Sequence, residues 1–222
     1  MKKQKITKLL SNLIIFSVVC IIGALSFVTN TGFLQATTTN SVIFESEENA
    51  VYLVFRLLDD DVDDILEILD KKAVKANFLV SGKYASNYSE NLVKITDKNH
   101  EIINHGYLNR DFSALGYTET CDDIKTAEKV ILSACGYKTT IFMPPKAKFN
   151  DSTLASCSEL GYNLVLYTKN AISDEVEDIR EILVSATSGD VIILSTNDVT
   201  KCLLGEMIDS YLSKGLQIKT LA

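Results

Sequence analysis

The stretch NHEIINHGY, residues 99–107, decides the fold of this 222-residue chain. Its apolar segment Glu101–Asn104 is typical of a buried strand, and His105 stands where that strand should end. Similar apolar runs recur from residue 50 onward. In most of them successive residues, which point to opposite faces of a strand, are all apolar, as in strands that are covered on both faces. This pattern predicts seven strands: Val51–Phe55, Val74–Val80, Glu101–Asn104, Thr139–Met143, Tyr162–Thr168, Asp190–Leu194 and Leu216–Leu221.

Amphipathic segments lie between these strands, and several open with Ser, Thr, Asp or Asn, the residues that cap helices. Alternating strands and helices imply right-handed crossovers and a parallel sheet, either open or closed into a barrel. Chemistry would then lie at the carboxyl ends of the strands. Helices are expected over Asp63–Lys72, Ser89–Lys98, Thr118–Ala134, Asp151–Leu160, Asp174–Thr187 and Val199–Leu212. Glycines at or near element ends are Gly82, Gly136, Gly161, Gly189 and Gly215.

Four fragments occur in an order and spacing that resemble one known family. They are VKANFLVSGK (Val74–Lys83), NHEIINHGY (Asn99–Tyr107), FMPP (Phe142–Pro145) and GDVIIL (Gly189–Leu194). Together they resemble the polysaccharide deacetylases, the NodB-homology group or carbohydrate esterase family 4, over residues 50–222. The resemblance implies an α/β fold, a distorted seven-stranded (β/α) barrel. It also implies hydrolysis of N-acetyl groups on extracellular glycans with zinc or another divalent metal.

The residues that carry this chemistry in the family are mostly replaced. In the family's motif T-F-D-D-G, the first aspartate is the general base and the second binds the metal. Phe55 matches the Phe of this motif, so Arg56 and Leu57 stand at the two aspartate positions. In the motif H-[ST]-x-x-H, His105 is kept and Asn109 replaces the second metal-binding histidine. Guanidinium and leucine side chains supply neither a base nor a metal ligand at neutral pH.

Two further motifs are also changed. In R-P-P-Y, Pro144 and Pro145 remain and Met143 replaces the arginine; in L-x-H, Ser195 replaces the histidine that protonates the leaving amine. One of three metal ligands survives, so His105 is interpreted as a vestigial metal position and no cofactor is expected. Loss of the base, the acid and the ion predicts a catalytically inactive domain.

Other residues could rebuild a site around His105, but each has a plainer interpretation. His100 matches a position that is structural in the family, and no G-x-S-x-G elbow surrounds Ser195 to support a nucleophilic triad. Tyr107, Tyr117 and Tyr167 either flank a sugar-sized groove or pack half-buried. If such a groove binds a glycan, we expect the substrate contacts to come from Tyr107, Pro144, Pro145 and Tyr167. The acidic cluster Asp59, Asp60, Asp61, Asp63 and Asp64 is typical of a solvated helix N-terminus.

The N-terminus is interpreted as a targeting segment. Four lysines precede the apolar run Leu9–Val28, which is long enough to cross a bilayer. We expect a signal-anchor over residues 1–29 with a cytoplasmic N-terminus, a linker over 30–49 and an extracytoplasmic domain over 50–222. A cleaved signal peptide, giving a secreted protein, is the alternative.

Charge and cysteine content exclude several classes of function. Four of the 22 basic residues lie before Leu9, so residues 9–222 carry 18 basic against 29 acidic residues, a net charge of −11 that argues against nucleic-acid binding. No C-x-x-C pair exists, so a zinc ribbon or thioredoxin-like site is not indicated. Beyond Cys20 in the apolar run, the cysteines either pack as small apolar residues or form one bridge: Cys121, Cys135, Cys157 and Cys202.

The sequence therefore favours a membrane-anchored, extracytoplasmic deacetylase-like domain that binds a cell-wall glycan or an envelope protein without catalysis. The alternatives are a metal-dependent N-deacetylase acting on an N-acetylated cell-wall glycan through a non-standard site around His105, and a purely structural envelope protein.

Overall fold

The computed structural model describes residues 49–58 and 62–222. The predicted anchor, the predicted linker up to residue 48, and the acidic residues Asp59, Asp60 and Asp61 lie outside these ranges. Across the described ranges, every helix is too short or too polar to span a bilayer.

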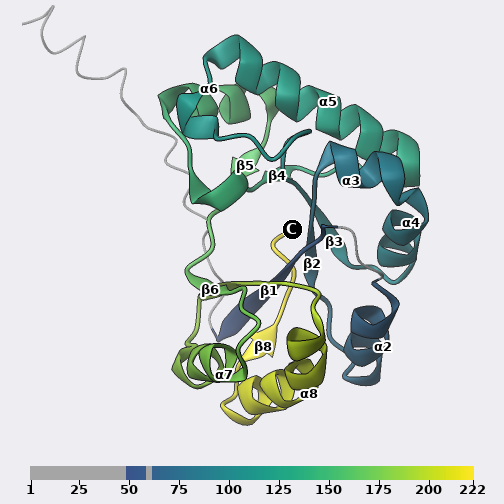
Figure 1. The fold of residues 1–222 in the computed structure, drawn as a ribbon, viewed down its shortest axis with the longest axis vertical. Coiled ribbons are helices and arrows are strands. Elements are labelled where there is room, and N and C mark those ends of the chain that lie inside the picture. Colours follow the sequence, from purple (N-terminus) through teal and green to yellow (C-terminus); the bar gives the residue numbers. More distant parts are fainter. Residues whose placement is uncertain (1–48, 59–61) are drawn as a thin grey trace, which may run out of the picture. The chain divides into compact units, whose positions relative to one another are not determined.

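A parallel sheet curls through the described domain (Figure 1). Its continuous path runs β5-β4-β3-β2-β1-β7-β6, and β8 pairs with the start of β1. Every recorded pairing is parallel, and no pairing joins β5 to β6 among the described residues, so the barrel is incomplete. The strands are β1 (Ala50–Arg56), β2 (Asn77–Val80), β3 (Glu101–Asn104), β4 (Ile141–Phe142), β5 (Asn163–Leu164), β6 (Lys169–Ala171), β7 (Val191–Leu194) and β8 (Gln217–Ile218).

The predicted α/β fold, a distorted (β/α) barrel, is confirmed, but the sheet that the described residues form has eight strands where seven were predicted. The apolar run 162–168 does not form one strand: it contains only the short β5, and β6 follows where no strand was predicted. Strand β6 reads Lys-Asn-Ala and buries only Ala171, so it lacks the apolar signature by which the other strands were predicted.

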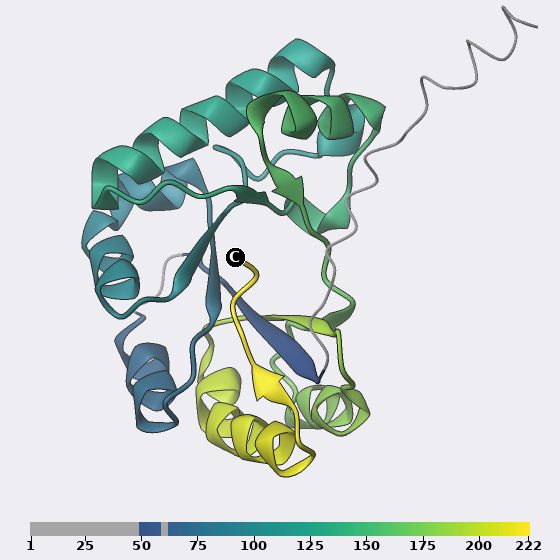
Figure 2. The same ribbon diagram turned by 180° about the vertical axis from the view of Figure 1, so that it is seen from behind.

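The helices line the outer side of the curled sheet in both views (Figures 1 and 2). They are α2 (Asp63–Lys71), α3 (Gly82–Asn87), α4 (Ser89–Asp97), α5 (Tyr117–Cys135), α6 (Asp151–Leu160), α7 (Val176–Ser185) and α8 (Asp198–Ser213), with short 3₁₀ turns η1 (Phe112–Ala114) and η2 (Pro145–Ala147). Six correspond to predicted helices, and α3 was missed. Gly82 opens α3, where Ser81 caps the helix by accepting a hydrogen bond from the Tyr84 backbone N–H.

Alternation along β1 divides the core into two sides. Leu53 and Phe55 belong to the large cluster between sheet and helices, whereas Tyr52 and Val54 belong to the smaller cluster on the concave side. Within the curl, the Asn77 side chain donates to the Leu53 carbonyl at 2.9 Å and accepts from the Leu221 N–H at 2.8 Å. This side-chain amide therefore holds Leu221 within the curl of the sheet, where Figures 1 and 2 show the C-terminus.

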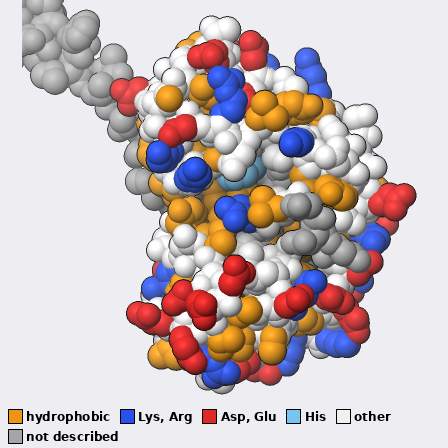
Figure 3. Space-filling model, in the orientation of Figure 1, with side chains coloured by type: hydrophobic (Ala, Val, Ile, Leu, Met, Phe, Trp, Pro, Cys, Tyr) orange, Lys and Arg blue, Asp and Glu red, His pale blue; other side chains and the backbone are white. Residues whose placement is uncertain are grey.

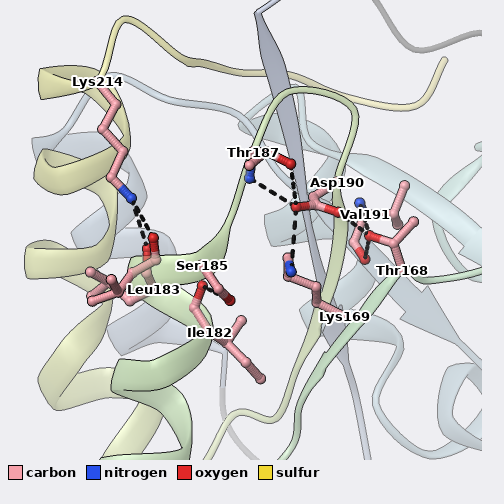
Figure 4. A network of polar contacts seen from close by, with 10 residues as sticks. Thr168, Lys169, Ile182, Leu183, Ser185, Thr187, Asp190, Val191 and Lys214 are labelled. Carbon is pink, nitrogen blue, oxygen red and sulfur yellow. Dashed lines mark hydrogen bonds and ion pairs between the residues drawn. The ribbon is translucent and has the colours of Figure 1, made fainter.

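Asp190 joins the short strand β6 to β7 (Figure 4). Its carboxylate accepts hydrogen bonds from the Thr168 hydroxyl at 2.7 Å and the Thr187 N–H at 2.9 Å, and lies 3.8 Å from the Lys169 ammonium. Burial opposes ionisation of Asp190, but these hydrogen bonds and the Lys169 charge outweigh it, so the pKa lies below its ordinary value. The contacts hold β6 in register although it buries little apolar surface.

The four cysteines in the described ranges are free thiols. Cys121 and Cys157 are buried, which matches their interpretation as small apolar residues, and Cys202 is exposed. Burial, with a smaller contribution from Cys121, raises the pKa of Cys157 to about 12.

Candidate functional site

A cavity of about 110 Å³ lies at the carboxyl ends of the strands. This position follows from the parallel sheet, since Arg56 ends β1, His105 follows β3, and Met143 and Pro144 follow β4. Figure 3 shows histidine surface in this view with Lys and Arg surface on several sides. The residues that line the cavity are Arg56, His105, Asn109, Met143, Pro144, Lys146, Tyr167, Asn170, Ile172 and Ile193.

His105 is buried and held by one backbone contact. Its Nδ1 atom lies 2.6 Å from the carbonyl oxygen of Met143. A carbonyl only accepts hydrogen bonds, so Nδ1 carries the proton and Nε2 of the neutral ring is an acceptor. Burial lowers the pKa of His105 to about 4; the Met143 carbonyl opposes this shift and the Arg56 guanidinium adds to it.

Arg56, which the family resemblance assigns to the general-base position, lines the cavity with its side chain. Alternation along β1 explains this, because Arg56 lies two residues after Val54 on the concave side. Its Nε atom is buried and has no hydrogen-bond partner among the described residues. The strand end therefore presents a permanent positive charge beside a neutral imidazole.

Leu57 does not face this cavity. It is 4% exposed and belongs to the cluster between sheet and helices, as Leu53 and Phe55 do. It also lines a separate cavity of about 370 Å³ with Ser81, Lys83, Tyr84, Tyr88 and others. The sequence treated Arg56 and Leu57 as two neighbouring positions of one site, whereas in the structure Arg56 lines the 110 Å³ cavity and Leu57 lines the 370 Å³ cavity.

The other predicted residues divide between the cavity and its surroundings. Asn109 is exposed and lines both the His105 cavity and the 370 Å³ cavity. Pro144 and Tyr167 line the His105 cavity, and Pro145 is buried at the start of η2. Tyr107 lines a third cavity, of about 240 Å³, with Arg110 and Glu119, and so is not brought together with the other substrate candidates.

Ser195 and His100 lie away from the cavity lining. The Ser195 hydroxyl lies 3.2 Å from that of Thr200, and Nδ1 of His100 accepts from the Ala76 N–H at 3.1 Å. Both contacts are structural. Asp63 and Asp64 lie in the first turn of α2, the helix start that the acidic cluster predicted.

Sequence reasoning missed Lys146, Asn170, Ile172 and Ile193 in the cavity lining. Lys146 follows the Pro-Pro motif directly, and that adjacency was the available signal. Asn170 lies in β6, which was not predicted. Ile193 was predicted within a strand, but its inward direction required the register of β7 against β1, where Val54 pairs with Ile193.

The lining residues do not fit the divalent metal of the family. The described residues contain no group of three His, Cys, Asp or Glu side chains able to hold an ion. His105 offers one acceptor nitrogen, and the Arg56 guanidinium beside it repels a cation. A site of this composition favours an anion over a metal ion.

Comparisons with known proteins agree with the fold. The chain is 27% identical to the uncharacterized protein YlxY of Bacillus subtilis, over 72% of this chain and 51% of that protein. It is 34% identical to a chitooligosaccharide deacetylase of a Bradyrhizobium species, over 40% of this chain and 42% of that enzyme. The chain thus spans about half the length of the curated relatives it matches.

Solved structures give the same result. A carbohydrate esterase family 4 pseudoenzyme from Bacillus anthracis superposes with a TM-score of 0.75 at 22% identity, covering 78% of this chain and 64% of that one. This likeness concerns the fold. The family model described as polysaccharide deacetylase matches residues 45–165, more than half of the sequence. The chain belongs to the polysaccharide deacetylase family.

Proposed function

We propose that this chain is a non-catalytic glycan-binding protein of the cell envelope, tethered to the membrane by its N-terminal segment. The observation that carries the proposal is the guanidinium of Arg56 in the His105 cavity, at the position where the family has its base. A guanidinium does not accept a proton from water, and its charge opposes the ion that would acidify that water.

Glycan binding is supported by family membership and by the two adjoining cavities. A matched relative is named for deacetylation of chitooligosaccharides. The 370 Å³ cavity is of the size that holds small-molecule ligands, typically ~300–1,000 Å³, and the half-buried Tyr88 among its lining residues suits contact with a sugar ring. Asn109 belongs to both cavities, so one oligosaccharide could contact both.

The tether is supported by the sequence alone. Four lysines followed by the apolar run Leu9–Val28 are typical of a single-pass anchor with a cytoplasmic N-terminus. Membrane fractionation of the full chain tests it, with mass spectrometry of the mature N-terminus. Recovery in the membrane pellet with residue 1 present supports the tether, and a mature chain beginning near residue 30 overturns it.

The experiment for the binding function uses the full chain and chito-oligosaccharides. We expect calorimetric binding that is unchanged by a chelator, no acetate release and no stoichiometric zinc. Acetate release that disappears in a His105→Ala variant would instead identify a metal-dependent N-deacetylase. Absence of any response across neutral and acidic glycans would favour a protein ligand and overturn the proposal.

A further inference from the structure

The His105 cavity carries the opposite charge to the domain around it. Arg56 and Lys146 line it, and its ten lining residues include no Asp or Glu. Residues 9–222 carry a net charge of −11. In Figure 3 much of the acidic surface lies lower in the view, over the α7 and α8 end of the molecule. Two cations in a recess of an acidic domain create a local field that attracts anions.

Arg56 is available to such an anion. No described carboxylate forms an ion pair with it, and its buried Nε atom has no described hydrogen-bond partner. Removing a charged group from water without a partner costs free energy. A carboxylate can offset that cost with two parallel hydrogen bonds to the planar guanidinium, a geometry that a lysine does not offer.

Lys146 supplies the second charge from a constrained turn. The backbone angle φ is +56° at Lys146 and +55° at Ala147, directly after Pro144 and Pro145. Residues other than glycine rarely adopt this left-handed conformation, so the neighbouring structure holds it in place. The turn keeps an exposed ammonium group at the rim of the cavity that contains Arg56.

The remaining polar groups and the volume define the ligand further. The neutral ring of His105 offers Nε2 as an acceptor for a hydroxyl or amide N–H, and Asn109 and Asn170 offer amides. A volume of about 110 Å³ exceeds the ~10–15 Å³ that one water needs but is below the ~300 Å³ of small-molecule pockets. The cavity thus suits a charged substituent of a sugar, with the ring in the adjoining 370 Å³ cavity.

We propose that the Arg56–Lys146 cavity binds the carboxylate of an acidic sugar in the glycan. This inference rests on the proposed glycan-binding function and names the chemical group that the site selects. The guanidinium of Arg56 pairs with the carboxylate, Lys146 adds charge at the rim, and His105 accepts a hydrogen bond from a neighbouring donor of the sugar.

A matched pair of ligands tests the inference on the full chain. N-acetylglucosaminyl-N-acetylmuramic acid and di-N-acetylchitobiose differ in one lactyl ether that bears a carboxylate. Calorimetry should give roughly 10- to 100-fold tighter binding of the acidic disaccharide, since charged hydrogen bonds contribute about 1.5–3 kcal/mol. This preference should weaken as salt is raised.

Substitutions then locate the effect. Arg56→Gln should abolish the preference for the acidic disaccharide, and Arg56→Lys should retain part of it because charge remains without the planar fork. Lys146→Asn, which tolerates a positive φ, should reduce the preference about threefold to tenfold even if Arg56 variants fold poorly. Arg110→Gln is the matched control, since Arg110 lines the separate Tyr107 cavity.

Two outcomes separate this inference from the proposed function. Equal binding of both disaccharides, unchanged in Arg56→Gln and Lys146→Asn, would overturn the carboxylate site and leave glycan binding intact. Failure of both disaccharides and of longer chito-oligosaccharides to bind would overturn the proposed function and the inference together.

Discussion

Nδ1 of His105 lies 2.6 Å from the carbonyl oxygen of Met143, which fixes both the tautomer and the direction of the ring. The strand end after β3 is thereby joined to the residue after β4, and Nε2 remains as the acceptor of a neutral imidazole. In a metal site this arrangement orients a ligand. Beside Arg56 it instead provides a neutral acceptor next to a cation.

Acid should destabilise the domain through its histidines. Burial lowers the pKa of both His100 and His105 to about 4, from an ordinary value near 6.5. Between pH 6.5 and 4 the unfolded chain therefore binds more protons than the folded one, so the free energy of unfolding falls as pH falls through this window. The fall is up to about 3 kcal/mol for each histidine. Urea denaturation at pH 7, 6, 5 and 4.5 measures it.

Asparagine variants isolate the contribution of each ring. Asn at position 105 can still donate to the Met143 carbonyl, and Asn at position 100 can still accept from the Ala76 N–H. His105→Asn and His100→Asn should each flatten the pH dependence. Burial raises the pKa values of Glu101 and Asp123, so these two groups change the free energy of unfolding with pH in the opposite direction to the histidines. Both groups are present in the two variants, so their contribution is the same in each. Identical slopes in wild type and variants would contradict the assignment.

Aspartate should be tolerated at residue 56 and not at residue 57. Arg56 is half-buried and lines the 110 Å³ cavity, whereas Leu57, although it borders the 370 Å³ cavity, is 4% exposed and packs in the apolar cluster against the helices. Leu57→Asp buries a carboxylate without a partner and should cost at least about 3 kcal/mol of unfolding free energy at pH 7, and less near pH 4 where the carboxyl is protonated. Arg56→Asp should cost less than about 1.5 kcal/mol. Equal losses in the two variants would show that both side chains face one site.

A metal site should be obtainable without changing Leu57. Arg56, His105 and Asn109 line the same cavity, and a zinc site of the catalytic kind uses three protein ligands. The double variant Arg56→Asp with Asn109→His should bind about one zinc per chain, measured by elemental analysis after dialysis, and adding His105→Asn should remove it. Zinc content equal to wild type in the double variant would contradict the convergence of these three positions.

The sequence predicted the sheet because its strands are apolar on both faces. His105 and Pro144 were assigned to a site through the family motifs that they match, and Tyr167 as an aromatic residue flanking a groove; all three line the cavity. Prediction from the sequence failed where local pattern carries little information. Strand β6 buries one side chain and is held by polar contacts from Asp190. Asp190 lies about twenty residues further along the chain and comes next to β6 only when the protein folds. The direction of Leu57 depends on how far the alternation of β1 continues, which a motif alignment does not contain.

Two glycines in helices should respond to alanine with opposite signs. A Cβ at Gly82, in the missed helix α3, would overlap the Tyr107 ring and lie 3.0 Å from Cα of Ala127, so Gly82→Ala must displace Tyr107 or α5. At Gly205 in α8 a Cβ would meet only the end of Lys72, at 3.7 Å. Gly82→Ala should lower the free energy of unfolding by about 1–3 kcal/mol, and Gly205→Ala should raise it by about 0.5–1 kcal/mol through helix propensity. Urea midpoints at constant slope measure both changes. Stabilisation by Gly82→Ala would show that α3 and Tyr107 are not in contact.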